Sequence, residues 1–137
     1  MKYILRHIEP LVLALSREYG AILVTGPRQV GKTTMLEKLM QGSSRAYVSL
    51  DDLNERQLAK TDPAMFLQMH PAPVLIDEVQ YAPELFSEIK RSIDKRKRPG
   101  AFWLTGSQPF QLMALAQESL AGRAAILHMT SLSQREI

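Results

Sequence analysis

The chain has 137 residues, of which 45% are hydrophobic and 23% are charged. This is the balance of one soluble globular domain that buries a core, so disordered and collagen-like classes are excluded. There is no cysteine, which excludes disulfides and thiolate metal sites, and the net charge of +3 is a mild preference for polyanions.

The sequence carries one apolar run near its start, at residues 11–15. Arg6, His7, Glu9 and Arg17 bracket this run too closely for a secretory signal or a membrane-spanning helix. We therefore expect a cytoplasmic protein that has no membrane among its partners.

Helix-like and strand-like patterns alternate along the chain. Apolar residues at helical spacing predict a first helix over residues 8–19, with Gly20 as its stop. Aliphatic, β-branched and aromatic runs predict strands over residues 21–24, 46–50, 74–78, 102–104 and 124–129. Helices are predicted between them: up to residue 41, after Asp52, from Pro63, with Pro83 in the first turn and ending at residues 95–98, and over residues 109–120. This alternation predicts an α/β fold with three αβα layers around a mostly parallel sheet.

A glycine-rich segment joins the strand at residues 21–24 to the next helix. Its spacing fits G-x-x-x-x-G-K-[ST], the phosphate-binding loop or Walker A motif, in the strand-to-helix context that the motif requires. Glycine at both ends gives the backbone conformations and the clearance with which N–H groups can surround phosphates. The residues predicted to bind the nucleotide are Gly26, Pro27, Arg28, Gln29, Val30, Gly31, Lys32, Thr33 and Thr34.

Two side chains of this segment have specific predicted roles. Lys32 is placed to reach the β- and γ-phosphates and so to contribute to catalysis, and the Thr33 hydroxyl is placed to bind Mg²⁺. The amino end of the following helix adds its dipole. We therefore expect a nucleoside triphosphate as ligand. The alternative is a glycine-rich turn between a core strand and a core helix.

Two acidic residues end the strand predicted over residues 74–78. A carboxylate at the carboxyl end of a buried parallel strand lies beside the phosphate-binding loop, so Asp77 is predicted to bind Mg²⁺. Glu78 is predicted to point elsewhere and to orient and deprotonate the attacking water. Small-molecule kinases with this loop do not need such a Glu, so the pair favours hydrolysis. The alternative is that both acids merely end a strand at the solvent.

Three polar residues follow the strand predicted over residues 102–104. Thr105, Ser107 and Gln108 offer hydroxyl and amide groups near the expected γ-phosphate. An equally good interpretation is that residues 105–107 form a turn and that Ser107 caps the next helix.

Arg123 follows the helix predicted over residues 109–120. An Arg at this place can reach the triphosphate of a neighbouring subunit and stabilise the transition state, an effect worth about 10³ to 10⁵ in rate. The alternative is a solvated Arg in a turn that contains glycine.

Lys90, Arg91 and residues 95–98 form a cationic stretch. Such a stretch can bind nucleic acid, but cations are also favoured at the carboxyl end of a helix. No aromatic pattern accompanies the charges, so we favour the second interpretation.

Five segments together resemble the ATPase domain of a large group of prokaryotic AAA-type P-loop proteins: residues 25–34, 50–52, 76–80, 104–107 and 119–123. The likeness extends over nearly all of the chain. It implies the AAA-type core with sheet order 5-1-4-3-2, and ATP with Mg²⁺ as cofactor. It also implies that Thr105 or Ser107 is in the sensor position and that Arg123 is in the finger position.

Members of that group continue into a separate C-terminal region, so we expect residues 1–137 to be one ATPase domain of a longer protein. The function we expect is Mg²⁺-dependent binding and hydrolysis of ATP, in a homo-oligomer where Arg123 acts on a neighbouring subunit. Two alternatives remain open. One is a nucleotide-operated switch with little turnover, and the other is a nucleic-acid-binding module with an auxiliary ATP site.

Overall fold

Five parallel strands form the centre of the fold. The computed structural model describes residues 2–27, 31–107 and 109–129. The strands are β1 (Ala21–Thr25), β2 (Ala46–Ser49), β3 (Val74–Asp77), β4 (Phe102–Gly106) and β5 (Ala124–His128). Their order in the sheet is β2-β3-β4-β1-β5, and every pair is parallel. Read from the other edge this is the expected order 5-1-4-3-2, so the predicted sheet is confirmed.

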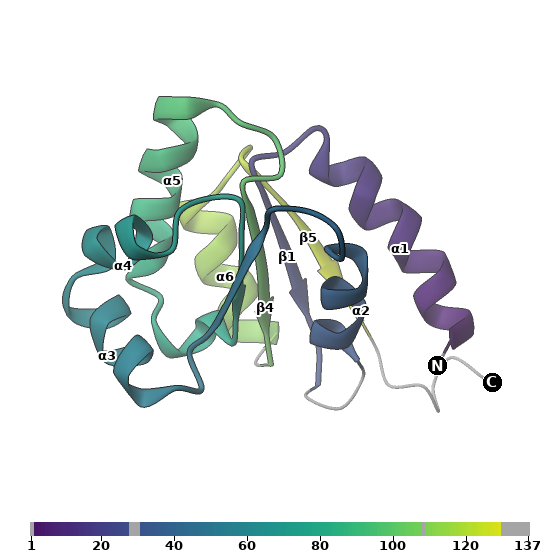
Figure 1. Cartoon of the computed structure of the whole chain (residues 1–137), viewed down its shortest axis with the longest axis horizontal. Coiled ribbons are helices and arrows are strands. Elements are labelled where there is room, and N and C mark those ends of the chain that lie inside the picture. Colours follow the sequence, from purple (N-terminus) through teal and green to yellow (C-terminus); the bar gives the residue numbers. More distant parts are fainter. Residues whose placement is uncertain (1, 28–30, 108, 130–137) are drawn as a thin grey trace.

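Helices cover both faces of this sheet (Figure 1). They are α1 (Lys2–Ser16), α2 (Lys32–Leu39), α3 (Leu53–Thr61), α4 (Pro63–Met69), α5 (Leu85–Arg96), α6 (Pro109–Ser119) and the 3₁₀ helix η2 (Val79–Tyr81). On one face, Val12 of α1 and Met35 of α2 join Leu75 and Trp103 of the sheet in a core. Side chains of α3, α4, α5 and α6 form a second core on the other face. The three predicted layers are therefore confirmed. None of the described helices combines the length and the apolar character that crossing a membrane requires.

The inner strands read as continuous apolar runs because both of their faces are buried. In β1, Ala21 and Leu23 face the core under α3 to α6, whereas Ile22 and Val24 face the core under α1 and α2. Successive side chains of a strand point to opposite faces, so a strand between two helical layers needs apolar residues at every position. In the edge strand β2, Val48 is the buried residue.

The first helix differs from its prediction at both ends. It begins and ends earlier than residues 8–19, at Lys2 and Ser16. Gly20 lies beyond its end and has another role: a Cβ there would lie 2.8 Å from Cγ2 of Ile93. A side chain at position 20 would therefore force the Ile93 side chain of α5 to move.

β4 is longer than predicted. It continues through Thr105 and Gly106, which one interpretation of the sequence placed in a turn. These residues pair with Val24 and Thr25 of β1, and Thr105 is fully buried. The turn interpretation is therefore wrong for them, because the parallel pairing with β1 extends the strand.

The segment between β3 and α5 also differs from the prediction. β3 ends at Asp77, because Glu78 adopts the left-handed conformation (φ 61°) and turns the chain into η2, which the sequence did not predict. Pro83 was predicted in the first turn of the next helix, but α5 begins only at Leu85. Pro83 therefore belongs to the connection.

The predicted cap of α3 is confirmed in part. The Asp52 carboxylate accepts hydrogen bonds from the N–H groups of Asn54 at 2.8 Å and Glu55 at 3.2 Å. Glu55 itself was expected to mark a capped start, but its Oε1 lies 2.8 Å from Nε2 of His70. This contact joins α3 to the end of α4.

Candidate nucleotide-binding site

The predicted phosphate-binding segment (residues 26–34) follows β1 and continues into the first turn of α2, at the carboxyl ends of the strands (Figure 1). Gly26 has a φ of 148°, and a Cβ there would lie 2.4 Å from the carbonyl oxygen of Met129. Gly31 has a φ of 86° at the start of α2. Both backbone conformations favour glycine, as the sequence predicted. Three further residues predicted to bind the nucleotide lie outside the described residues: Arg28, Gln29 and Val30.

The ammonium group of Lys32 bonds to the loop itself. Its Nζ donates to the carbonyl oxygens of Gly26 at 2.9 Å and Pro27 at 2.8 Å, and the residue is 3% exposed. A buried cation needs such partners. Phosphate oxygens bound by this loop would compete with the two carbonyls for the same donors. Thr34, also a predicted nucleotide ligand, lies in the first turn of α2 with an exposed side chain.

Thr33 and Asp77 are brought together from α2 and β3. The Thr33 hydroxyl donates to Oδ1 of Asp77 at 2.7 Å. Asp77 is 6% exposed, so this contact is made in a largely buried place. The two residues predicted to bind the metal are therefore neighbours, although they are 44 positions apart in the chain.

Three more hydroxyl groups reach the Asp77 carboxylate. Thr105 donates to Oδ1, and Tyr47 and Ser49 donate to Oδ2 at 3.2 and 3.3 Å. Burial, followed by the charge of Asp77, raises the pKa of Tyr47 to about 12, so this phenol keeps its proton at neutral pH. The sequence selected Thr105 but missed Tyr47 and Ser49. Their alternation with the apolar Val48, in a strand beside β3, is the signal that could have found them.

Glu78 shares Thr105 with Asp77, but its carboxylate has partners of its own. Its N–H donates to the Thr105 hydroxyl at 3.0 Å. Its Oε1 accepts from the Ser107 hydroxyl at 2.7 Å and from Nε2 of Gln80 at 2.8 Å. A left-handed residue other than glycine costs about 1–3 kcal/mol and persists where its surroundings impose it. The ends of β3 and β4 together therefore fix both the backbone and the carboxylate of Glu78.

Ser107 and Gln80 also contact each other. The Ser107 N–H donates to Oε1 of Gln80 at 3.3 Å, so the amide of Gln80 bridges Glu78 and the end of β4. The sequence did not select Gln80, because the direction of its side chain depends on the unpredicted helix η2. Gln108, a candidate in the sequence, lies outside the described residues.

A third carboxylate adjoins the first two. One oxygen each from Asp51, Asp77 and Glu78 lies within 4.8 Å of the others, and the Thr33 hydroxyl reaches this group through Asp77. Mg²⁺ prefers oxygen ligands, and carboxylates above all, so Asp77 and the Thr33 hydroxyl fit this ion, with the carboxylates of Asp51 and Glu78 close by. Asp51 was not selected from the sequence. Its neighbour Asp52 does not belong to this group, and its carboxylate caps the amino end of α3.

Arg123 lies at the amino ends of the strands, directly before β5 and opposite the phosphate-binding segment. Its carbonyl oxygen accepts from the N–H of Ala21 at 3.2 Å, at the amino end of β1. Its guanidinium donates to both carboxylate oxygens of Asp94, at 2.6 and 3.1 Å, and to the carbonyl of Ala121 at 2.9 Å. The hydrogen bonds from Arg123 lower the pKa of Asp94, so the pair is charged at neutral pH. The fold therefore does not bring Arg123 to the phosphate-binding segment of its own chain.

A family model described as an AAA domain matches residues 18–137 of this chain. Two curated relatives are uncharacterised proteins of Mycobacterium tuberculosis and Mycobacterium bovis. Each is 36% identical over 117 residues, which are 85% of this chain and 26% of the relative. The chain thus spans about a quarter of the length of these relatives.

Solved structures share the fold. The Walker-type ATPase of Pyrococcus abyssi has a TM-score of 0.61 and 17% identity, over 89% of this chain and 52% of that one. The P-loop NTPase domain of the sigma-54 transport activator from E. coli has a TM-score of 0.60 and 14% identity, over 94% and 97%. The RuvB Holliday junction branch migration motor of Thermotoga maritima has a TM-score of 0.55 and 18% identity, over 94% and 45%. At such identities the likeness concerns the fold alone, that of P-loop NTPases.

Proposed function

This chain belongs to the family of AAA domains, and on that basis we propose that it binds ATP with Mg²⁺ and hydrolyses it. One observation carries the proposal: two carboxylates with different hydrogen-bond partners lie at the carboxyl ends of the strands, where the phosphate-binding segment also lies. Asp77 is bonded to Thr33, whereas Glu78 is bonded to Ser107. Hydrolysis needs these two roles, one acid that binds the metal and another that activates the attacking water.

Binding uses the loop and the first turn of α2. Lys32 exchanges the carbonyl oxygens of Gly26 and Pro27 for β- and γ-phosphate oxygens, which are stronger acceptors because they are charged. Thr33 and Asp77 would hold Mg²⁺, and this ion would neutralise part of the negative charge on the phosphates.

Hydrolysis uses Glu78 as the general base. Its carboxylate takes a proton from the attacking water, while the bond between the γ-phosphorus and the bridging oxygen breaks to give ADP and phosphate. Ser107 and Gln80 keep the carboxylate in place, because both donate to its Oε1.

The first test is the substitution Lys32→Ala. We expect the affinity for Mg·ATP to fall by about 10- to 100-fold, since a hydrogen bond to a charged group is worth about 1.5–3 kcal/mol. A fluorescence titration with mant-ATP measures this change, and thermal denaturation without nucleotide checks that the variant is folded. The matched control is Lys38→Ala, because Lys38 lies on the same helix with a side chain that is 67% exposed. Undiminished binding by folded Lys32→Ala would refute the assignment of the site.

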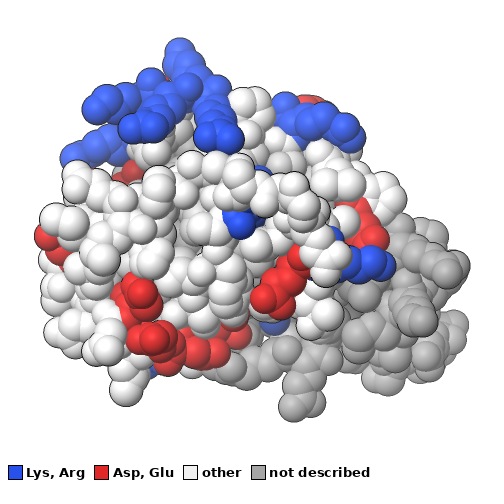
Figure 2. All heavy atoms as spheres, in the orientation of Figure 1, with Lys and Arg blue, Asp and Glu red and all other residues white. Residues whose placement is uncertain are grey.

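A second candidate function is binding of nucleic acid at the carboxyl end of α5. Lys and Arg side chains gather there in Figure 2, at the end of the molecule opposite the phosphate-binding segment. The exposed cations of this surface are Lys90, Arg91, Lys95, Arg96, Lys97 and Arg98. The preference of cations for a helix end accounts for the last turn of α5 but not for Lys90 and Arg91 before it.

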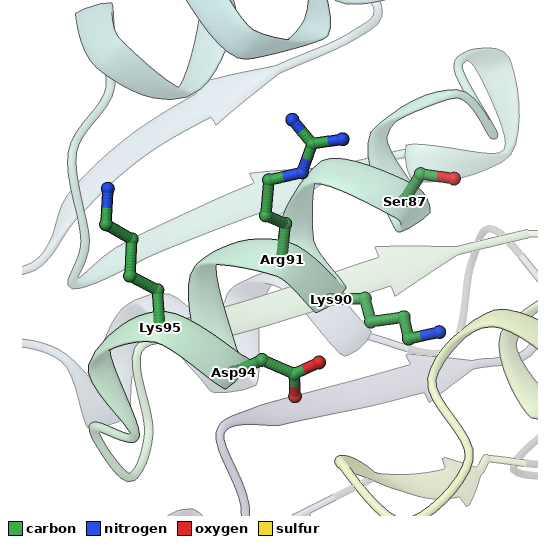
Figure 3. A pocket seen from close by; sticks show the side chains of 5 residues that line it. All are labelled: Ser87, Lys90, Arg91, Asp94 and Lys95. Atoms are coloured by element: carbon green, nitrogen blue, oxygen red, sulfur yellow. The ribbon is translucent and has the colours of Figure 1, made fainter.

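A hollow of about 560 Å³ lies within this surface (Figure 3). Its lining residues are Ser87, Lys90, Arg91, Asp94 and Lys95. Arg91 and Lys95 point to the same side of α5 in Figure 3. The one acid among these residues, Asp94, is bonded to Arg123, so positive charge prevails. A phosphate backbone is the kind of partner that such a surface fits.

This second candidate predicts salt-dependent binding of duplex DNA. Each phosphate contact contributes about 0.9 to the slope of log affinity against log salt. Replacing both Arg91 and Lys95 by Gln should therefore lower the magnitude of the slope by about 2, which fluorescence anisotropy can measure. The control is the pair Lys38→Gln and Lys60→Gln, two exposed cations on other helices. An equal loss with the control pair, or no binding at low salt, would argue against nucleic acid.

A further inference from the structure

Four hydroxyl groups surround the Asp77 carboxylate, two on each oxygen. Thr33 and Thr105 donate to Oδ1, and Tyr47 and Ser49 donate to Oδ2. An ionised carboxylate has about four acceptor positions. The protein's own hydroxyl groups therefore use all of them.

The edge strand β2 places two of these hydroxyls. Ser49 is directly opposite Asp77 in the parallel pairing of β2 with β3. Tyr47 lies two residues earlier and hence on the same face of the sheet, and its longer side chain reaches the same oxygen, 3.2 Å away. Val48, between them, enters the core on the other face.

The two carboxylate oxygens have partners of different kinds. On Oδ1, Thr33 belongs to the phosphate-binding segment, and its hydroxyl oxygen is also a proposed ligand of Mg²⁺. On Oδ2, both partners belong to β2 and have no proposed contact with the nucleotide. If the Thr33 hydroxyl bound Mg²⁺ in place of Oδ1, Thr105 would still donate to that oxygen, and Tyr47 and Ser49 would still donate to the other.

We propose that Tyr47 and Ser49 are positioning residues for Asp77: by donating to Oδ2 they hold the carboxylate in one orientation, in which it would bind Mg²⁺. This inference rests on the proposed function. A plain packing role for Tyr47, which is 42% exposed, does not explain why two hydroxyls from one strand converge on one oxygen. A buried acceptor that loses its hydrogen-bond donors costs free energy. Removing a group that orients a metal ligand lowers the affinity of the site for the metal.

The test is the Mg²⁺ dependence of mant-ATP binding by Tyr47→Phe, which removes one hydroxyl. We expect the Mg²⁺ concentration for half-maximal binding to rise about tenfold. This is the lower limit of the usual loss of metal affinity when a group that orients a metal ligand is removed. Binding of mant-ATP in EDTA should stay at the wild-type level, because Tyr47 acts through Asp77. The matched control is Tyr19→Phe, at the opposite edge of the sheet, where the Tyr19 carbonyl accepts from Gly100.

Two further variants connect the effect to Asp77. Ser49→Ala removes the other donor to Oδ2 and should raise the Mg²⁺ requirement in the same way; it replaces Tyr47→Phe in the test if denaturation shows that variant to be unfolded. In an Asp77→Asn background, Tyr47→Phe should raise the requirement no further.

The outcomes separate this inference from the proposed function. An unchanged Mg²⁺ requirement in folded Tyr47→Phe, or in Ser49→Ala, would overturn the inference alone. A further rise in the Asp77→Asn background would also overturn it, since Tyr47 would then act by another route. If the wild-type protein bound mant-ATP with the same affinity in Mg²⁺ and in EDTA, the proposed metal site would be overturned, and the inference with it.

Discussion

Replacing Glu78 by Gln is expected to slow ATP turnover by about 10²- to 10⁴-fold, the usual contribution of a general base. The affinity for Mg·ATP should stay close to that of the wild type, because Glu78 is assigned to water and not to phosphate or metal. Steady-state phosphate release gives the first quantity, and a mant-ATP titration gives the second.

The geometry makes this substitution a test of chemistry and not of position. Oε1 of Glu78 accepts from Ser107 and Gln80, and the side-chain oxygen of Gln can accept the same two bonds. What Gln cannot do is take a proton from water at neutral pH. A loss of turnover can therefore be attributed to the missing base.

Glu84→Gln is the matched control, since Glu84 is an exposed acid just before α5 whose side chain makes no capping hydrogen bond. It should leave turnover unchanged. If Glu78→Gln kept turnover within a few-fold of wild type while binding ATP normally, another group would have to activate the water.

Replacing Arg123 by Ala is expected to slow the turnover of assembled subunits by about 10³- to 10⁵-fold, the range of an arginine finger. Turnover per subunit should rise with protein concentration in the wild type, because one subunit completes the site of the next. The rise should disappear in Arg123→Ala. Phosphate release measured over a wide range of protein concentration tests both statements.

The position of Arg123 explains why this effect can arise only between subunits. The five residues of β1, at about 3.3 Å each, separate it from the phosphate-binding segment by about 16 Å. Its guanidinium is also engaged by Asp94. Action on a neighbouring triphosphate therefore requires Arg123 to leave Asp94, and Asp94→Asn should make the rise in activity begin at a lower concentration.

Two results would contradict the role of Arg123. One is turnover above that of Glu78→Gln that does not depend on protein concentration, since this would indicate a self-sufficient monomer. The other is an equal loss in Arg91→Ala, whose side chain is 78% exposed on the cationic surface of α5. In either case the ion pair with Asp94 would remain as a purely local contact.

The sequence by itself determined the elements and the outline of the site. The spacing of apolar residues along the chain predicts the helices and strands, because an element that is buried on one or both faces needs apolar residues at the buried positions. Gly26, Gly31 and Lys32 are recognisable because a loop that surrounds phosphates needs these residue types at a fixed local spacing. Asp77 and Glu78 are recognisable because they interrupt a buried run at its end. These features are local, so no knowledge of neighbouring strands is needed.

Only the tertiary structure decided which side chains meet these residues. Tyr47 and Ser49 reach Asp77 because β2 lies beside β3 in one particular register, and the left-handed turn at Glu78 is fixed by Thr105, 27 residues away. Because β5 runs parallel to β1, Arg123, which directly precedes β5, lies at the amino ends of the strands, opposite the loop. Strand order and register are set by how the whole core packs, and spacing along the chain does not contain them. The partners that tune each carboxylate, unlike the carboxylates themselves, therefore had to be found in the folded chain.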